Sequence, residues 1–381
     1  MKILIIGGGI GGLSTAIALK QRAIDYQIFE AAPELKPVGA GIWMAPNALQ
    51  VLDRLGLAEA VKARGWRLQE ARITDQKGRL LSAIDGSGVE ARYGHGLCAI
   101  HRGRLQQVLL DALDKDRIQT GKRLRSILQT PETVQAIFED GSTATGDVLI
   151  GADGIHSPSR RSLFGDIPLR YSGQTCWRGV ARLKLPDALS AQGHEMWGQR
   201  AGLRIGFSHI HPEEVYWYVS LATPPANQNL SNDKSLLEAL VAEFPETARQ
   251  VIAAADAASI IRTDLFDLKP IPAWYEGRVV LLGDAAHATT PNLGQGGSQA
   301  IEDAWVLADA LARFARPADA FGHYQQVRMP KAQRIVQTSY QIGRLSNLGG
   351  RWATGLRNTL LRLTPRSVND RQLEFLYRCN H

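Results

Sequence analysis

Cysteine is scarce in this 381-residue sequence and does not occur in pairs. Cys98, Cys176 and Cys379 lie far apart and lack the C-x-x-C spacing of a redox or zinc motif. This pattern argues against disulfide and zinc chemistry, excludes a disulfide reductase, and favours a reducing compartment.

The sequence also lacks a long apolar run. No stretch approaches the roughly 20 apolar residues of a membrane-spanning helix. The apolar run at residues 3–6 is broken by three glycines, and no small-residue cleavage pattern follows it, so it does not match a signal peptide. We therefore expect a soluble, cytoplasmic protein with no stable membrane insertion.

Dense blocks of one charge are missing as well. Lys and Arg total 44 against 37 Asp and Glu, a net charge of +7 that is spread along the chain. This distribution does not suggest nucleic-acid binding, and it is compatible with an anionic ligand. Hydrophobic residues at 44% and charged residues at 21% exclude a disordered or fibrous chain. At about 150 residues per domain, the length fits two domains or one large domain with a second lobe.

Glycine, in contrast, is plentiful, with 37 residues. Residues 3–6 are typical of a strand buried on both faces of a parallel sheet. They lead into G-x-G-x-x-G at Gly7, Gly9 and Gly12, and residues 13–20 continue as a helix. In such a turn Gly7 permits the tight bend, Gly9 lets the backbone approach a pyrophosphate, and Gly12 lets helix and strand pack closely.

A second strand at residues 26–29 ends at Glu30. A carboxylate there can accept hydrogen bonds from a ribose 2′-hydroxyl and would repel a 2′-phosphate. The order strand, turn, helix, strand and acidic residue predicts a dinucleotide site, and a ligand-free glycine turn is the weaker alternative. This unit alone does not distinguish NAD from FAD.

Two later strands also end in polar, glycine-containing loops. Residues 147–150 lead into a segment that contains Asp153, and residues 278–282 lead into Asp284 and a Pro-Gly loop, followed by a helix at residues 299–308. Such loops present polar groups at the carboxyl ends of the strands of an α/β sheet. Asp153 also fits a simple turn cap, whereas Asp284 has no convincing structural explanation.

Together, the three motifs resemble those of the single-component, FAD-dependent aromatic hydroxylases (para-hydroxybenzoate hydroxylase type, or group A flavin monooxygenases). Salicylate hydroxylases, FAD-dependent urate hydroxylases and zeaxanthin epoxidases are relatives within this group. The resemblance spans about residues 1–335, with the motifs in the family order. It implies FAD as cofactor, NADH or NADPH and O2 as co-substrates, and a small aromatic or heteroaromatic substrate. Without a second G-x-G-x-x-G, we expect no separate NAD(P)H domain.

The resemblance also implies individual cofactor contacts. The glycine turn would hold the pyrophosphate, Glu30 the ribose, Leu124 the adenine through its backbone, and Asp284 the ribityl hydroxyls. The Pro-Gly loop would face flavin N1 and C2=O, where a helix N-terminus can stabilise an anionic flavin. No metal site is implied. The implied cofactor-binding residues are Gly7, Gly9, Gly11, Gly12, Glu30, Ala31, Trp43, Arg102, Leu124, Asp153, Asp284, Pro291, Gly294, Gln295, Gly296 and Gly297.

Apart from the resemblance, some of these residues have ordinary structural explanations. Arg102 fits a surface cation on an amphipathic helix equally well. His156 and His287 follow strand ends, where a histidine usually satisfies a local hydrogen bond, so we expect structural roles for both.

The implied fold is α/β: a Rossmann-type FAD-binding domain with an inserted, mostly antiparallel β-sheet substrate domain and C-terminal helices. We expect residues 1–165 and 271–335 to form the FAD-binding domain, and residues 166–270 the substrate-domain sheet. A segment at about 70–100 would contribute to the substrate lobe. Residues 336–381 would form the C-terminal helical segment.

Residues 171–183, 202–207 and 215–220 have strand patterns and predict neighbours in an antiparallel sheet. Alternation along the first of them places Cys176 and Arg178 on one face, opposite Trp177. In the relatives, this sheet roofs the substrate cavity.

The resemblance therefore makes Arg178, Arg204 and Tyr216 the candidates for catalytic groups in that cavity, although Arg204 and Tyr216 could also lie on the sheet surface. Reduced flavin reacts with O2 to give a C4a-hydroperoxide, which hydroxylates an electron-rich carbon. Ionising a substrate phenol at neutral pH costs roughly 4 kcal/mol. One arginine about 4 Å away contributes a similar amount at an effective dielectric near 20. An arginine in place of the amide expected near Arg178 argues against urate as the substrate.

After Pro330 the sequence is basic and helical, and Trp352, Leu356, Leu360 and Leu363 recur at helical spacing. This pattern fits a membrane-docking surface, but we favour a helix that packs its apolar stripe on the main body.

Two other functions remain open: epoxidation of an apolar polyene, and non-catalytic flavin binding. A flavin-dependent halogenase is disfavoured because the Trp-x-Trp-x-Ile signature is absent. The sequence does not indicate the substrate, the choice of NADH or NADPH, or the oligomeric state.

Overall fold

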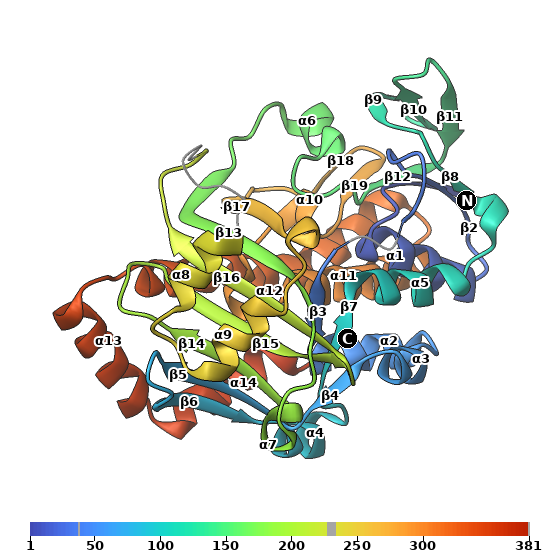
Figure 1. Ribbon diagram of the computed structural model, residues 1–381. Helices are drawn as coiled ribbons and strands as arrows, with labels where there is room; N and C mark the ends of the chain where they lie inside the picture. Colours follow the sequence, from blue (N-terminus) through green and yellow to red (C-terminus); the bar gives the residue numbers. More distant parts are fainter. Residues whose placement is uncertain (37–38, 227–233, 380–381) are drawn as a thin grey trace.

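Two large sheets and a layer of helices form the body of the protein (Figure 1). The computed structural model describes residues 1–36, 39–226 and 234–379. Two three-stranded sheets complete the β structure of these residues. One comprises β9 (Leu124–Gln129), β10 (Val134–Phe138) and β11 (Thr143–Gly146), and the other β3 (Gly41–Met44), β4 (Trp66–Leu68) and β7 (Leu97–His101).

The first large sheet is parallel except at one edge. Its strand order is β18 (Tyr275–Glu276), β19 (Val279–Leu281), β12 (Val148–Gly151), β1 (Lys2–Ile6), β2 (Asp25–Phe29) and β8 (Ile118–Gln119). The four strands expected at residues 3–6, 26–29, 147–150 and 278–282 therefore lie side by side as β1, β2, β12 and β19 in the middle of the sheet. This arrangement confirms the Rossmann-type prediction.

The second large sheet has seven strands and is antiparallel except where β14 meets β5. Its order is β17 (Ile261–Asp267), β13 (Arg170–Arg182), β16 (Glu214–Ala222), β15 (Arg204–His211), β14 (Gln192–Trp197), β5 (Glu70–Asp75) and β6 (Leu80–Asp85). Trp177 and Trp217 are buried in the apolar core on one face, under α8 (Lys234–Val241) and α9 (Glu246–Ala253). The predicted mostly antiparallel sheet is confirmed.

Helices cover the parallel sheet. α1 (Ile10–Gln21) packs against α11 (Gly296–Arg313), and α11 packs against α12 (Pro317–Ser346) and α2 (Pro46–Arg54). α12 runs without a break past residue 335 and also contacts β13 of the second sheet. The remaining α-helices are α3 (Ala58–Ala63), α4 (Gly86–Tyr93), α5 (Arg102–Asp111), α6 (Pro158–Phe164), α7 (Asp187–Ser190), α10 (Asp284–His287), α13 (Arg351–Leu363) and α14 (Arg366–Tyr377).

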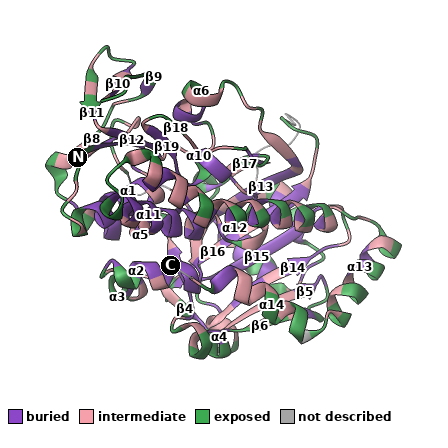
Figure 2. Cartoon of the chain, turned by 180° about the vertical axis from the view of Figure 1, so that it is seen from behind, coloured by how far each residue is buried: buried purple, intermediate pink, exposed green. Residues whose placement is uncertain are grey.

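Helix α13 corrects one expectation. It lies at the edge of the molecule, and much of it is coloured as exposed (Figure 2). The four side chains of its apolar stripe are exposed to solvent and do not pack on the main body. The buried side chains of α13 are Thr354 and Arg357. The preference for a packed stripe was therefore wrong. No helix among the described residues is both long and apolar enough to cross a bilayer.

Candidate active site

A cavity of about 1640 Å³ is lined by residues of the antiparallel sheet and by loops at the ends of the parallel strands. It extends from the glycine turn after β1, past the loop before α11, to the face of the antiparallel sheet that carries Arg178. Helix α14 borders its far end. This volume exceeds the roughly 300–1,000 Å³ of pockets for drug-sized ligands. The cavity is therefore large enough for a dinucleotide head and a second, small molecule.

Close packing explains the glycines of the first turn. Gly7 has φ +112°, and a Cβ there would lie 2.3 Å from the carbonyl oxygen of Ala152. A Cβ on Gly12 would lie 2.0 Å from the carbonyl oxygen of Gly7, whereas one on Gly9 would meet nothing within 4 Å. Gly9 borders the cavity, so a ligand can approach its backbone. These contacts match the tight turn, the open approach and the helix packing predicted for the three positions.

Glu30 holds the turn from the neighbouring strand. Its carboxylate accepts hydrogen bonds from the backbone N–H groups of Gly8, at 2.6 Å, and Ala32, at 2.8 Å. Each carboxylate oxygen can still accept a further hydrogen bond, so a contact with a ribose stays a prediction. Gly7, Gly12, Glu30, Ala31 and Leu124 lie outside the lining of the cavity.

Asp153 caps the start of α6. Its carboxylate accepts hydrogen bonds from the Ser157 hydroxyl and, at 2.8 Å, from the backbone N–H of Ser159. Burial raises the pKa of this carboxyl group. These contacts fit the turn-cap explanation, and the implied cofactor contact of Asp153 stays a prediction.

Asp284 begins α10 and is separated from β19 by Leu282 and Gly283, and its side chain is exposed to the cavity. Desolvation by the surrounding protein raises the pKa of its carboxyl group, although the neighbouring His287, Arg102 and Arg160 act in the opposite direction. His287 itself is buried, with Nε2 2.5 Å from Oδ2 of Asp303. The expected structural role of His287 is confirmed.

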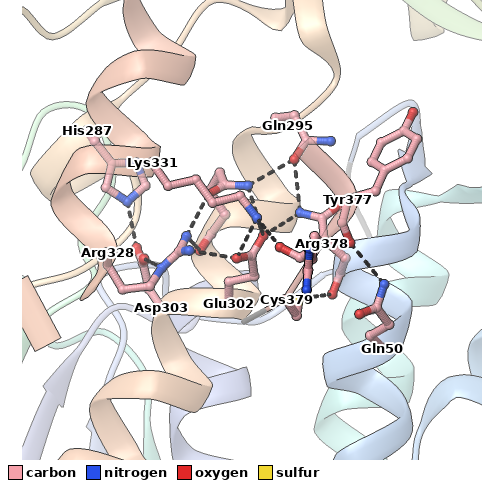
Figure 3. Close-up of polar contacts among 12 residues, drawn as sticks. Gln50, His287, Gln295, Glu302, Asp303, Arg328, Lys331, Tyr377, Arg378 and Cys379 are labelled. Carbon is pink, nitrogen blue, oxygen red and sulfur yellow. Dashed lines mark hydrogen bonds and ion pairs between the residues drawn. The ribbon is translucent and has the colours of Figure 1, made fainter. Parts of the chain in front are cut away.

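The loop before α11 lies above a buried polar network (Figure 3). Oε1 of Gln295 accepts hydrogen bonds from Asn47, at 3.0 Å, and Gln299, at 2.9 Å. Asn47 also donates to Glu302 at 2.5 Å. Gln295 is buried and immediately precedes the first turn of α11. The network therefore fixes the backbone N–H groups that the helix presents to the cavity.

Two carboxylates and an arginine form the centre of this network. The Arg328 guanidinium lies 2.6 Å from Glu302 and 2.8 Å from Asp303, and all three side chains are fully buried. Lys331 adds a second cation, 2.9 Å from Glu302. Despite the desolvation, Arg328 and Lys331 lower the pKa of Glu302. Sequence reasoning missed this network, although two adjacent acids in an otherwise apolar helix were a usable signal.

Arg178 and Tyr216 face the cavity from β13 and β16. Nη2 of Arg178 donates to the Thr263 hydroxyl at 2.9 Å, while its buried Nε has no hydrogen-bond partner among the described residues. Burial raises the pKa of Tyr216, so its hydroxyl stays protonated and can donate. Both residues therefore offer donors near one face of the cavity.

Arg204 also borders the cavity but is only 3% exposed, which excludes a position on the sheet surface. Its Nη1 lies 3.2 Å from Glu195, and its Nη2 donates to Asn292 at 2.7 Å. Asn292 belongs to the short helix η3 (Pro291–Leu293) of the loop before α11. Arg204 thus ties the antiparallel sheet to the loop next to the implied flavin site.

Glu195 is a further cavity residue that sequence reasoning missed. Besides Arg204, it accepts hydrogen bonds from the Tyr218 hydroxyl, at 2.5 Å, and from Trp197 Nε1, at 2.6 Å. Tyr218 follows Tyr216 by two residues, so strand alternation alone places both on one face. Glu195 gave no such signal, because the strand β14 was not predicted.

The remaining implied cofactor residues lie along the same cavity. Trp43 donates from Nε1 to the Ser208 hydroxyl at 2.9 Å. Arg102 is the first residue of α5. Both border the cavity together with Gly11, Pro291, Gly294, Gln295, Gly296 and Gly297. An open glycine backbone at one end, a cavity-facing carboxylate and a glycine-rich helix N-terminus match the parts of FAD, so the residues present fit this cofactor.

The comparisons with known proteins support this assignment. Residues 1–339 match the family model described as FAD binding domain. The chain belongs to this family. It is 37% identical to aurachin C monooxygenase/isomerase of Stigmatella aurantiaca, over 95% of this chain and 94% of that protein. It is 36% identical to 2-heptyl-3-hydroxy-4(1H)-quinolone synthase of Pseudomonas aeruginosa, over 99% and 98% of the two chains.

A solved structure agrees with these sequence matches. HpxO of Klebsiella pneumoniae, complexed with FAD and uric acid, superimposes with a TM-score of 0.89 at 30% identity, covering 99% of this chain and 96% of that chain. The protein is therefore an FAD-dependent monooxygenase of the aromatic-hydroxylase type, as the motifs implied.

Proposed function

We propose that this monooxygenase hydroxylates a heteroaromatic ring of the 4-quinolone type that carries an apolar substituent. The observation that carries the proposal is the far end of the cavity, where a group of apolar side chains lies among polar ones such as Glu70, Asp85 and Arg92. Beyond the polar groups of the antiparallel sheet, it is lined by side chains from β5, β6, α4, β7, α13 and α14. They include Ala71, Ile73, Ala83, Ile84, Val89, Leu97, Leu361, Val368, Leu373 and Leu376.

The polar groups near the flavin end fit a ring that carries oxygen and nitrogen. Arg178 and the protonated hydroxyl of Tyr216 can donate to a ring oxygen, and charge on Arg178 favours the electron-rich, anionic form of that ring. This need for donors favours ring hydroxylation over epoxidation of a polyene, which has no group for them to bind.

The surroundings of Arg204 indicate that Arg178 is the one cation that activates the substrate. Because its charge is compensated by Glu195, it contributes little to binding an anionic substrate such as urate. Its contact with Asn292 favours a positioning role, in which it holds the loop next to the flavin against the substrate sheet.

The reaction replaces a ring C–H with C–OH. NADH or NADPH supplies two electrons, and O2 supplies one oxygen atom to the product and one to water. When bound, FAD supplies the redox chemistry that joins these reactants. The residues of this chain would orient the ring, exclude water, and provide N–H donors from the first turn of α11 to the flavin edge.

The test is a panel of 4(1H)-quinolones with 2-alkyl chains of increasing length, together with urate and para-hydroxybenzoate. NADH or NADPH consumption is measured alongside hydroxylated product. We expect coupled turnover with quinolones, and KM values that fall as the chain lengthens, since each buried CH2 contributes about 0.8 kcal/mol.

Two variants complete the design. Leu373→Asn should raise KM for long-chain quinolones about tenfold while leaving the shortest nearly unchanged, and Arg178→Gln should lower kcat for all of them. The exposed Leu128→Asn is the matched control. Coupled turnover of urate alone, or KM values independent of chain length, would refute the proposed substrate class.

A further inference from the structure

Helix α13 exposes a continuous apolar row. Trp352 is 94% exposed, Leu356 65%, Leu360 56% and Leu363 71%. Single exposed leucines are ordinary in proteins. Here the spacing of four, four and three residues places all four side chains on one side of the helix. Leu348 and Val368, beyond the two ends of α13, are exposed as well.

Contacts on the opposite side of the helix hold this orientation. Arg357 is buried, and its guanidinium lies 4.8 Å from the centre of the Trp197 ring and donates to the Gly198 carbonyl at 3.2 Å. The backbone N–H of Gly350, next to the start of α13, donates to the Gln199 carbonyl at 3.0 Å. Turning the leucines inward would remove Arg357 from these partners. The outward stripe is therefore fixed by specific packing.

The charge around the stripe is positive. Residues 348–369 contain four arginines and no Asp or Glu. Arg351 is exposed at the start of α13. At the other end, Arg362 donates to the Leu80 carbonyl at 3.3 Å and lies 3.6 Å from the buried Asp75, which also pairs with Arg79. Two arginines therefore share one carboxylate there, which leaves a net positive charge at this end of the stripe. An apolar stripe flanked by arginines matches the pattern of helices that lie in the interface of anionic membranes.

We propose that α13 docks this enzyme on the surface of an anionic lipid bilayer. The helix, about 20 Å long, would lie in the plane of the membrane, with Trp352 at the headgroup level. The other side of α13 borders the cavity through Leu361. Docking therefore places the far end of the cavity, with its group of apolar side chains, beside the lipid. The proposal rests on the stripe and its charge, and it does not depend on the substrate.

A second copy of the chain is the competing occupant. Two copies that met through α13 would place the exposed Arg351 of each copy at the interface, and α13 has no acidic residue to pair with it. This like-charge contact disfavours a dimer through α13 and favours an anionic surface.

The test is vesicle flotation of the FAD-loaded protein. We expect binding to vesicles of phosphatidylcholine with phosphatidylglycerol, and weaker binding to phosphatidylcholine alone or at high salt. The double variant Leu356→Asn, Leu360→Asn should reduce the bound fraction at least tenfold, and Trp352→Ser should also reduce it. Leu128→Asn, at a leucine 58% exposed on β9, should bind like the wild type.

FAD content and circular dichroism confirm that the variants are folded, and the 94% exposure of Trp352 makes its replacement safe for folding. Failure of the wild type to float with anionic vesicles overturns the proposal, as does unchanged flotation of both stripe variants. Sedimentation that reveals a dimer dissociated by the double variant, without vesicle binding, assigns the stripe to a second copy.

Discussion

Asp284 and Arg204 both border the cavity, but their surroundings differ. Arg204 is hydrogen-bonded to Glu195, Asn292 and Ser220. The Asp284 carboxylate faces the cavity, and no described side chain hydrogen-bonds to it. Because Arg204 is hydrogen-bonded to other side chains, it can position them. The Asp284 carboxylate has no such partner among the described side chains and is available to a ligand.

This difference leads to a prediction for Asp284. Asp284→Asn should weaken FAD binding by about 10- to 100-fold, because a hydrogen bond to a charged group contributes about 1.5–3 kcal/mol. The dissociation constant is measured by titrating the apoprotein with FAD and following flavin fluorescence. Asp166→Asn, at an exposed carboxylate paired with Arg161, is the control and should bind FAD like the wild type. Equal affinity of Asp284→Asn and wild type would contradict a role of Asp284 in holding the cofactor.

At the scale of single elements, local patterns predicted the parts of the fold that depend on local physics. The buried strands at residues 3–6 and 26–29 were recognisable because apolar runs that end in glycine have few alternatives in an α/β protein. The turn at Gly7 was recognisable because its positive φ and close backbone contacts require glycine.

Orientation and pairing could not be predicted in the same way. The stripe of α13 faces outward because Arg357 finds its partners at Trp197 and Gly198, about 160 residues earlier in the chain. Glu195 enters the cavity because β14 pairs with β5 and β15. Such contacts are set by tertiary packing, and a hydrophobic period in one segment carries no information about them.

The network under α11 supports a prediction at this scale. Arg328→Met should lower the free energy of unfolding by about 3–5 kcal/mol, because it leaves the buried carboxylates of Glu302 and Asp303 without their shared cation. It should also weaken FAD binding, since the network fixes the first turn of α11. Urea unfolding and FAD titration measure the two effects.

The control for Arg328 lies just before the start of the same helix. Arg316→Met removes a cation paired with Asp319 at the surface and should change stability by less than about 1 kcal/mol. A loss of similar size in both variants would show that the buried network contributes no more than a surface ion pair.

The two large sheets behave as parts of one molecule because several contacts cross between them. α12 contacts both α11 and β13, and the bond from Arg204 to Asn292 joins the substrate sheet to the loop before α11. Four further histidines of the molecule are buried or half-buried. Desolvation lowers the pKa values of His95, His101, His194 and His209, so all four favour the neutral form in the folded protein.

The free energy of unfolding of the whole protein should therefore depend on pH. Burial, assisted by Arg72, lowers the pKa of His194 to about 4, whereas an unfolded histidine titrates near 6.5. Below about pH 6.5, His194 is protonated in the unfolded chain but stays neutral in the folded protein until the pH approaches 4. His194 alone should thus remove about 2 kcal/mol of stability between about pH 7 and pH 5. Carboxylates with lowered pKa values, such as Asp303, lose their contribution only at more acidic pH.

Urea unfolding at several values between about pH 7.5 and pH 5 measures this dependence. His194→Gln should flatten the curve by about 2 kcal/mol at pH 5, because glutamine has no proton to gain. His156→Gln, at an exposed histidine, should leave the curve unchanged. If His194→Gln follows the wild-type curve, or if His156→Gln flattens it equally, a buried neutral His194 is not the source of the acid sensitivity.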